Sequence, residues 1–226
     1  NLNSELIQIN KNIAFSKYAL RNIKPININK ILLINPIQVP SEFYDPEMAK
    51  KNRYFCYPPY GIGVISSILK DHNFEVKILD LNYEILKSNL DNDKQLINTE
   101  KELLANTLNS FNPELIAVSC MFTITHESFK RVIKALRLLN FKGIISAGGV
   151  HITNDVDKIK KDIPEIDLVF PHESEFEFLQ FIFNHNNEIM PENILKTVDI
   201  KPFFDDLEIS KYSQAGEIGA YRFWWK

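Results

Sequence analysis

The stretch KILLIN, Lys30–Asn35, decides the fold class, because it is a short and almost wholly apolar run that Pro36 ends. Such a run is typical of a β-strand that is covered on both faces. Four more short apolar runs follow along the chain, at Phe74–Leu79, Leu115–Ser119, Gly143–Ala147 and Asp167–Phe170. Buried strands of this kind form parallel sheets, because the connections between them shield both faces from water.

Helical patterns separate these runs. Apolar residues recur at helical spacing in four segments, Tyr60–Lys70, Gln95–Leu108, His126–Leu139 and Val156–Ile163. A last helix is expected after Ser174, because Glu177 follows three residues later with the spacing of a capping box. Strand and helix therefore alternate five times, which predicts an α/β fold with a five-stranded, parallel, doubly wound sheet of Rossmann-like or flavodoxin-like type.

The chain divides into three predicted parts. Residues 1–29 form an N-terminal helical arm, because apolar side chains recur at helical spacing from Ser4 to Ile23. Residues 30–186 form the α/β domain. Residues 187–226, with Pro191, Pro202 and acidic side chains at Asp205 and Asp206, are interpreted as a linker or C-terminal extension towards a missing or separate catalytic unit.

Charge and cysteine content exclude several classes of protein. The chain has 226 residues and a formal net charge of −3, and no stripe of Lys and Arg follows a candidate helix, so nucleic acid is not expected as a partner. No apolar run is long enough to cross a bilayer and no signal peptide is recognisable, which favours a cytoplasmic protein without membrane contact. Cys56 and Cys120 are too few for a zinc or iron–sulfur framework.

Ligands of open parallel sheets bind outside the carboxyl ends of the strands. The candidate cofactor-binding residues are therefore taken from the strand-end loops and the helix entry that faces them: Asn35, Pro36, Tyr60, Gly61, Asp80, Ser119, Met121, Phe122, Thr123, Gly148, Gly149, His151 and Glu173. The pair Gly148 and Gly149 is the most informative, because two missing Cβ atoms let a bulky ligand lie against the backbone, although a plain turn also explains it. No residue is predicted to be catalytic or to bind a metal.

Four stretches in this order and spacing resemble a known family. They are YPPYGIGVISSILKDHNFEVKILDLN (Tyr57–Asn82), ELIAVSCMFTIT (Glu114–Thr125), GGVHIT (Gly148–Thr153) and DLVFPHESEFEFLQFI (Asp167–Ile182). They are similar to the amino-terminal cobalamin-binding domain of B12-dependent radical SAM enzymes. The resemblance covers residues 30–186 and implies a corrinoid, with its cobalt, in the crevice at the sheet edge, against a radical SAM barrel in cis or in trans. Many members are methyltransferases, so methyl transfer is the implied chemistry.

Two departures from related patterns narrow this expectation. The loop after the first strand, Asn35–Pro40, lacks the cobalt-binding His of the D-x-H-x-x-G motif, and the chain contains no C-x-x-x-C-x-x-C for an iron–sulfur cluster. The resemblance therefore implies a corrinoid-presenting module that catalyses nothing alone. S-adenosylmethionine and a 4Fe-4S cluster are implied only if a radical SAM domain follows.

Two other interpretations stay open. A dinucleotide site is suggested by Gly61 and Gly63 at a helix entry and by Asp80 about 20 residues later, but Ser66 replaces the third glycine and no strand directly precedes the pair. The other interpretation is a scaffold that binds no cofactor and serves protein contacts.

Overall fold

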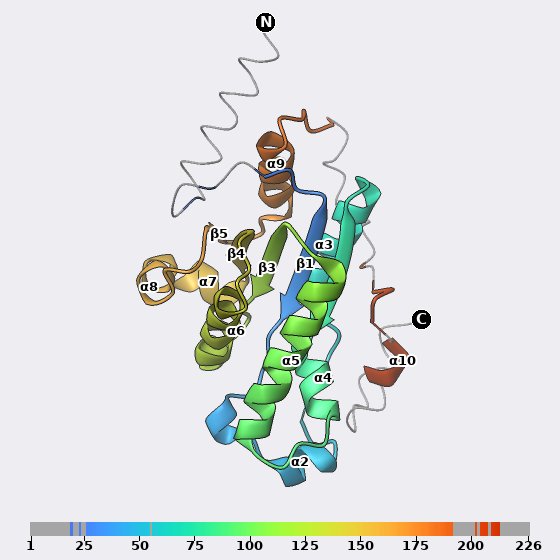
Figure 1. Cartoon of the computed structure of the whole chain (residues 1–226), viewed down its shortest axis with the longest axis vertical. Helices are drawn as coiled ribbons and strands as arrows, with labels where there is room; N and C mark the ends of the chain where they lie inside the picture. Colours follow the sequence, from blue (N-terminus) through green and yellow to red (C-terminus); the bar gives the residue numbers. More distant parts are fainter. Residues whose placement is uncertain are drawn as a thin grey trace, which may run out of the picture.

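Five parallel strands form one sheet in the order β2-β1-β3-β4-β5 (Figure 1). The structure is a computed structural model that describes Ala19, Ile23 and residues 26–54, 56–191, 202, 204–207 and 209–212. The strands are β1 (Lys30–Asn35), β2 (Glu75–Asp80), β3 (Leu115–Ser119), β4 (Ile144–Gly148) and β5 (Leu168–Phe170). The predicted α/β fold with a five-stranded parallel sheet is confirmed, and each strand lies within one residue of its predicted bounds.

The helices that connect the strands include several short ones that the sequence pattern did not predict. The α-helices are α2 (Pro46–Lys50), α3 (Tyr60–Asp71), α4 (Leu81–Lys87), α5 (Asp93–Phe111), α6 (His126–Leu138), α7 (Val150–Asn154), α8 (Val156–Asp162), α9 (Glu175–His185) and α10 (Ile209–Tyr212). Two short 3₁₀ helices are η1 (Ser41–Phe43) and η2 (Thr123–Thr125). In the part of the chain that the structure describes, no helix is both long and apolar enough to cross a membrane.

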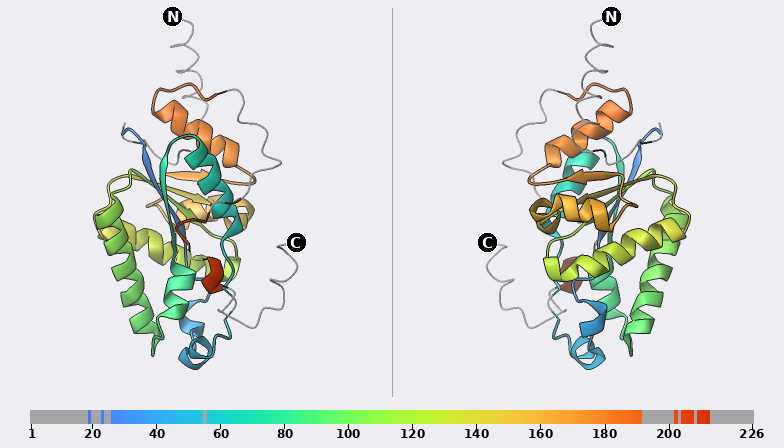
Figure 2. Two further views of the ribbon diagram at one scale, coloured as in Figure 1. Left: turned by 90° about the vertical axis from the view of Figure 1, so that its right-hand side faces the viewer. Right: turned by 90° about the vertical axis from the view of Figure 1, so that its left-hand side faces the viewer.

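The two faces of the sheet bury alternate residues of each strand. Leu32 and Ile34 of β1 pack with α4, α5 and α6 on one face, whereas Ile31 and Leu33 pack with α3 and α9 on the other. Helices α3 and α9 contact each other and lie side by side (Figure 2). This alternation is the reason that the strand sequences are apolar throughout, since both faces are covered.

Two local predictions are wrong. Ala19 forms an isolated antiparallel bridge with Leu168 of β5, so the helix predicted from Ser4 to Ile23 does not continue through Ala19. The rest of that predicted helix, apart from Ile23, lies outside the described residues. The capping box at Ser174 is also absent, because its Oγ donates to the carbonyl oxygens of Pro171 and His172 and accepts nothing from the first turn of α9.

The described part of the predicted linker contacts the α/β domain. Ile78 of the edge strand β2 donates its backbone N–H to Asp206 Oδ2 at 3.0 Å. Phe204 occupies the space beside Gly63 of α3, where a Cβ atom would overlap its ring. Tyr212 is buried and donates to Asp80 Oδ2 at 2.6 Å. The domain boundary at residue 186 stays a prediction, and residues 213–226 lie outside the described part of the chain.

Candidate functional site

A cavity of about 200 Å³ opens at the carboxyl ends of β1, β3 and β4, on the face that α3 and α9 cover. Its floor is made of small side chains on adjacent strands, because the register places Ala117 beside Ser146 and Ser119 beside Gly148. The cavity lies where the chain order reverses between β1 and β3, the position at which doubly wound sheets of this strand order bind ligands. Small residues in two central strands therefore create the hollow at this switch point.

Seven of the predicted site residues line this cavity: Asn35, Tyr60, Gly61, Ser119, Met121, Gly148 and Gly149. The other six do not line it: Pro36, Asp80, Phe122, Thr123, His151 and Glu173. For all thirteen, contact with a ligand stays a prediction. The seven come from β1, α3, β3, β4 and the loops that follow these strands, so the structure brings together residues up to 114 positions apart (Asn35 to Gly149).

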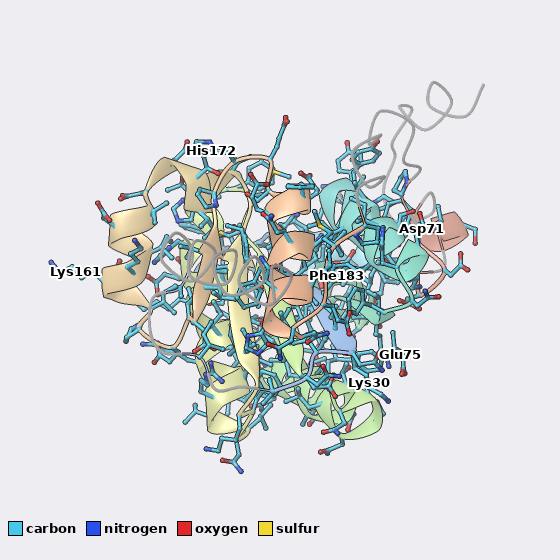
Figure 3. The ribbon with its side chains drawn as sticks, turned by 90° about the horizontal axis from the view of Figure 1, so that it is seen from above. Lys30, Asp71, Glu75, Lys161, His172 and Phe183 are labelled. Carbon is cyan, nitrogen blue, oxygen red and sulfur yellow. The ribbon has the colours of Figure 1, made fainter. Side chains whose placement is uncertain are left out.

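The missed lining residues are mainly inside strands and helices. They include Leu33, Ala117 and Ser146, which lie two residues before the predicted Asn35, Ser119 and Gly148, and also Ile62, Ile65, Phe170 and Phe178. Side chains two apart on a strand share one face, so the strand period already contained the signal for the first three. His172, from the loop after β5, also lines the cavity. In the view of Figure 3 it lies far from Lys30 and Glu75, which pair at the amino ends of β1 and β2.

The mouth of the cavity carries exposed apolar side chains. Tyr60, Met121 and Val150 line it and are 62%, 46% and 55% exposed, and Phe122 and Ile124 beside Met121 are exposed as well. A group of exposed apolar side chains around a hollow marks a binding surface. The described residues that line the cavity include no Lys or Arg, so the site suits a large neutral ligand better than a phosphate.

The glycines at the site have different roles. A Cβ atom at Gly61 would meet nothing within 4 Å, and one at Gly148 would make only an ordinary contact with the carbonyl oxygen of Phe170 at 3.5 Å, so both positions have room for a Cβ atom. Gly149 has φ of +109°, and a Cβ atom there would lie 2.5 Å from the carbonyl oxygen of Cys120. Gly149 is therefore required by the turn itself, and Gly148 is the member of the pair that leaves room for a ligand.

Asp80 is buried beside the cavity and is fully hydrogen-bonded. Its Oδ1 accepts from Asn35 Nδ2 at 2.8 Å and from the backbone N–H groups of Asn82 and Tyr83, and its Oδ2 accepts from Tyr212. Burial raises the pKa of this carboxyl group, and the hydrogen bonds act in the opposite direction. Because Asp80 is only 2% exposed, it is not placed to hold the ribose of a dinucleotide, and Gly63 packs on Phe204.

A buried histidine pair lies next to the site. His126 Nδ1, at the start of α6, is 3.0 Å from His151 Nε2 in α7, and His151 Nδ1 is 3.2 Å from Thr123 Oγ1. His126 Nε2 lies 3.7 Å from Asp162 Oδ2. Burial lowers the pKa of both histidines, since the charged form loses hydration. His151 therefore acts in this structure as a contact between the loop after β3 and α7.

The strand order and the cavity at the switch point define an α/β ligand-binding domain. The chain matches the B12 binding domain family over residues 48–180, which is more than half of its length, and it belongs to that family. It is also similar to cytidylyl-2-hydroxyethylphosphonate methyltransferase from Streptomyces wedmorensis, with 24% identity over 169 residues. That match covers 73% of this chain and 30% of the relative, so the chain spans less than a third of the length of that protein.

Proposed function

We propose that this chain is a cobalamin-binding module that presents a corrinoid to a catalytic unit for methyl transfer. The observation that carries the proposal is the cavity at the switch point, with exposed apolar side chains around its mouth, in a chain of the B12 binding domain family. The absence of Lys and Arg from the described lining residues favours this ligand over a dinucleotide, because no described cationic side chain lines the cavity to pair with the two phosphates.

The shape of the site fits a ligand that is only partly enclosed. Its volume of about 200 Å³ is below the range of roughly 300–1,000 Å³ that encloses a drug-sized molecule. A corrinoid is larger still, so its macrocycle would lie over the mouth, on Tyr60, Met121 and Val150, with a smaller part inside. Gly61 and Gly148 line the cavity and carry no side chain that would obstruct the ligand. When bound, the corrinoid would supply cobalt as the carrier of the methyl group, and the protein would supply binding and orientation.

The catalytic unit is proposed to be a radical SAM barrel, in cis or in trans. The similar methyltransferase is more than three times as long as the region shared with this chain, which leaves room there for a further domain. S-adenosylmethionine and a 4Fe-4S cluster would belong to that unit. This chain would then catalyse no reaction alone, and its two free, buried thiols are compatible with the cytoplasmic location expected for it.

Binding of hydroxocobalamin to the full chain tests the proposal. After removal of free ligand by gel filtration, we expect a corrinoid absorption spectrum to remain with the protein. Gly148→Val should abolish this binding, because its side chain would extend from the strand end into the cavity, whereas the melting temperature should change little. Gly148→Ala is the graded control and should retain partial binding.

The outcomes separate the possible ligands. Failure of the parent chain to retain any corrinoid would contradict the proposal and favour a scaffold. Retention of NADH or flavin in its place would support the dinucleotide interpretation. Equal corrinoid binding by the parent and Gly148→Val would show that the ligand lies elsewhere.

A further inference from the structure

Asn35 is a buried polar residue that lines the cavity, and its hydrogen bonds fix the orientation of its side-chain amide. It is 5% exposed, lines the cavity, and donates from Nδ2 to Asp80 Oδ1 at 2.8 Å. That oxygen also accepts the backbone N–H groups of Asn82 and Tyr83, at 3.1 and 3.2 Å. An oxygen with three donors can only be an acceptor, so the group of Asn35 that faces it must be the amide nitrogen.

The other end of the amide is free to meet a ligand. Among the described residues, no donor is bonded to Asn35 Oδ1, and this oxygen stays accessible although the residue as a whole is 5% exposed. Because Asn35 lines the cavity, a ligand that enters the cavity can bring a hydrogen-bond donor to this oxygen. Protonation of Asp80 would not change this orientation, because the proton would sit on Oδ2, which faces Tyr212.

We propose that Asp80 is a positioning residue that holds Asn35 with its amide oxygen towards the cavity, and that Asn35 thereby selects a hydrogen-bond donor of the ligand. The inference rests on the proposed function and adds a specificity to it. The periphery of a corrinoid carries carboxamide groups, whose N–H bonds are donors of this kind. A carboxylate or phosphate at the same place would be rejected, because its oxygen atoms and Asn35 Oδ1 are all hydrogen-bond acceptors.

A double-mutant cycle in the full chain tests the coupling of the two residues. The affinity for hydroxocobalamin is measured for the parent, Asn35→Ala, Asp80→Ala and the double variant. We expect each single substitution to weaken binding about tenfold, the effect of one lost hydrogen bond. The double variant should bind no more weakly than Asn35→Ala, because Asp80 acts only through Asn35.

Asp80→Asn is the conservative variant and should bind like the parent. Its amide oxygen can accept the same three N–H donors, and its amide nitrogen can donate to the Tyr212 hydroxyl. A melting curve for each variant shows whether it folds. If Asp80→Ala does not fold, Asn35→Ala still tests whether Asn35 binds the ligand, and Asp80→Asn still tests whether a hydrogen-bond acceptor at position 80 is enough to position Asn35.

Ligand selectivity gives a readout that a purely structural role would not change. Dicyanocobinamide carries amides, whereas dicyanocobyrinic acid carries carboxylic acids in their place, and both lack the nucleotide. We expect the parent to prefer the amide form, and we expect Asn35→Ala to lose about tenfold of that preference. If the parent binds hydroxocobalamin and Asn35→Ala keeps the affinity of the parent and its preference for the amide form, this inference is overturned and the proposed function is not. No binding of hydroxocobalamin by the parent would overturn the proposed function and this inference with it.

Discussion

At the scale of single residues, Gly148 and Gly149 are neighbours with opposite tolerance for a side chain. Gly149 has φ of +109° and lies against the backbone of Cys120, which accepts the N–H of His151 at 3.1 Å. Gly148 has ordinary strand geometry and its missing Cβ atom faces the cavity. Substitution of each glycine by alanine therefore tests which of the two the fold requires.

We expect Gly149→Ala to lower the free energy of unfolding by about 2 kcal/mol or more, from backbone strain and overlap with Cys120. Gly148→Ala, its matched control, should stay within about 0.5 kcal/mol of the parent. Urea denaturation of both variants measures this difference. Equal stabilities would contradict the role of Gly149 in the turn.

At the scale of elements, the histidine pair joins the start of α6 to α7. If His151 Nε2 donates to His126 Nδ1, then His126 Nε2 carries a proton towards Asp162 and the Thr123 hydroxyl donates to His151 Nδ1. The opposite tautomers would turn a lone pair of His126 towards the Asp162 carboxylate. The first arrangement is favoured on this ground, and in it both rings are neutral.

Stability should therefore fall as the pH is lowered from about 7.5 to 5.5. Burial lowers the folded-state pKa of both rings, so the unfolded chain binds more protons once the pH drops below about 6.5. Glu127 and Asp162 act against this shift at His126 and Asp155 does so at His151, whereas Lys130 and Lys158 add to it. The urea midpoint as a function of pH measures the slope.

His151→Gln should make this pH dependence shallower, because one of the two buried rings is removed. The control is His172→Asn, at an exposed position with φ of +63° that Asn tolerates, and it should keep the slope of the parent. A slope that His151→Gln leaves unchanged would show that other groups cause it.

The sequence predicted those helices and strands whose apolar residues recur in a regular pattern along a short segment. The strand at Lys30–Asn35 was found at its exact bounds because its apolar run is set by burial on both faces. Helix α4 was missed because it starts directly at the strand end, where the Asp80 side chain accepts the N–H groups of its first turn. The role of Tyr212 could not be predicted, since its partner Asp80 is 132 residues away and nothing local marks the contact.

The same difference applies to the candidate site. The rule that ligands bind at the carboxyl ends of parallel strands predicted Asn35, Ser119 and Gly148, and all three line the cavity. It could not show that Asp80 faces Asn35 and not the cavity, since that depends on the packing of α4 and α10. It also could not separate the need of the turn for glycine at position 149 from that of a ligand, and contact of Gly149, which lines the cavity, with a ligand stays a prediction.

At the scale of the whole molecule, the segment around α10 closes the β2 side of the sheet. Asp206 accepts the N–H of Ile78 from the edge strand and lies 3.7 Å from Lys70 Nζ, and Tyr212 reaches the buried Asp80. The ring centroids of Tyr212 and Tyr83 are 4.5 Å apart. These contacts tie residues 204–207 and 209–212 to β2, whose last residue Asp80 bonds to the cavity-lining Asn35.

Tyr212→Phe should therefore destabilise the domain although only one oxygen atom is removed. Asp80 Oδ2 would stay buried without its donor, at a cost of about 2 kcal/mol, which corresponds to a fall of roughly 4–8 °C in melting temperature for a chain of this length. Tyr60→Phe is the matched control, because that ring is 62% exposed, and it should melt like the parent. Identical melting of the two variants would contradict a structural role for Tyr212.

Alkylation of the two cysteines can locate this change within the molecule. Burial raises the pKa of the thiols to about 12 for Cys56 and about 11 for Cys120, so both should react slowly with iodoacetamide at pH 8 in the parent. Both cysteines belong to the core cluster that contains Tyr212, but Cys56 contacts Asn82 beside Asp80, whereas Cys120 lies next to Thr125 in the loop after β3. We expect Tyr212→Phe to accelerate the modification of Cys56 several-fold and to leave that of Cys120 unchanged, because only the contact near β2 is loosened. Equal acceleration at both sites would mean that the variant unfolds globally, and no acceleration at either would mean that the segment around α10 does not protect the end of β2.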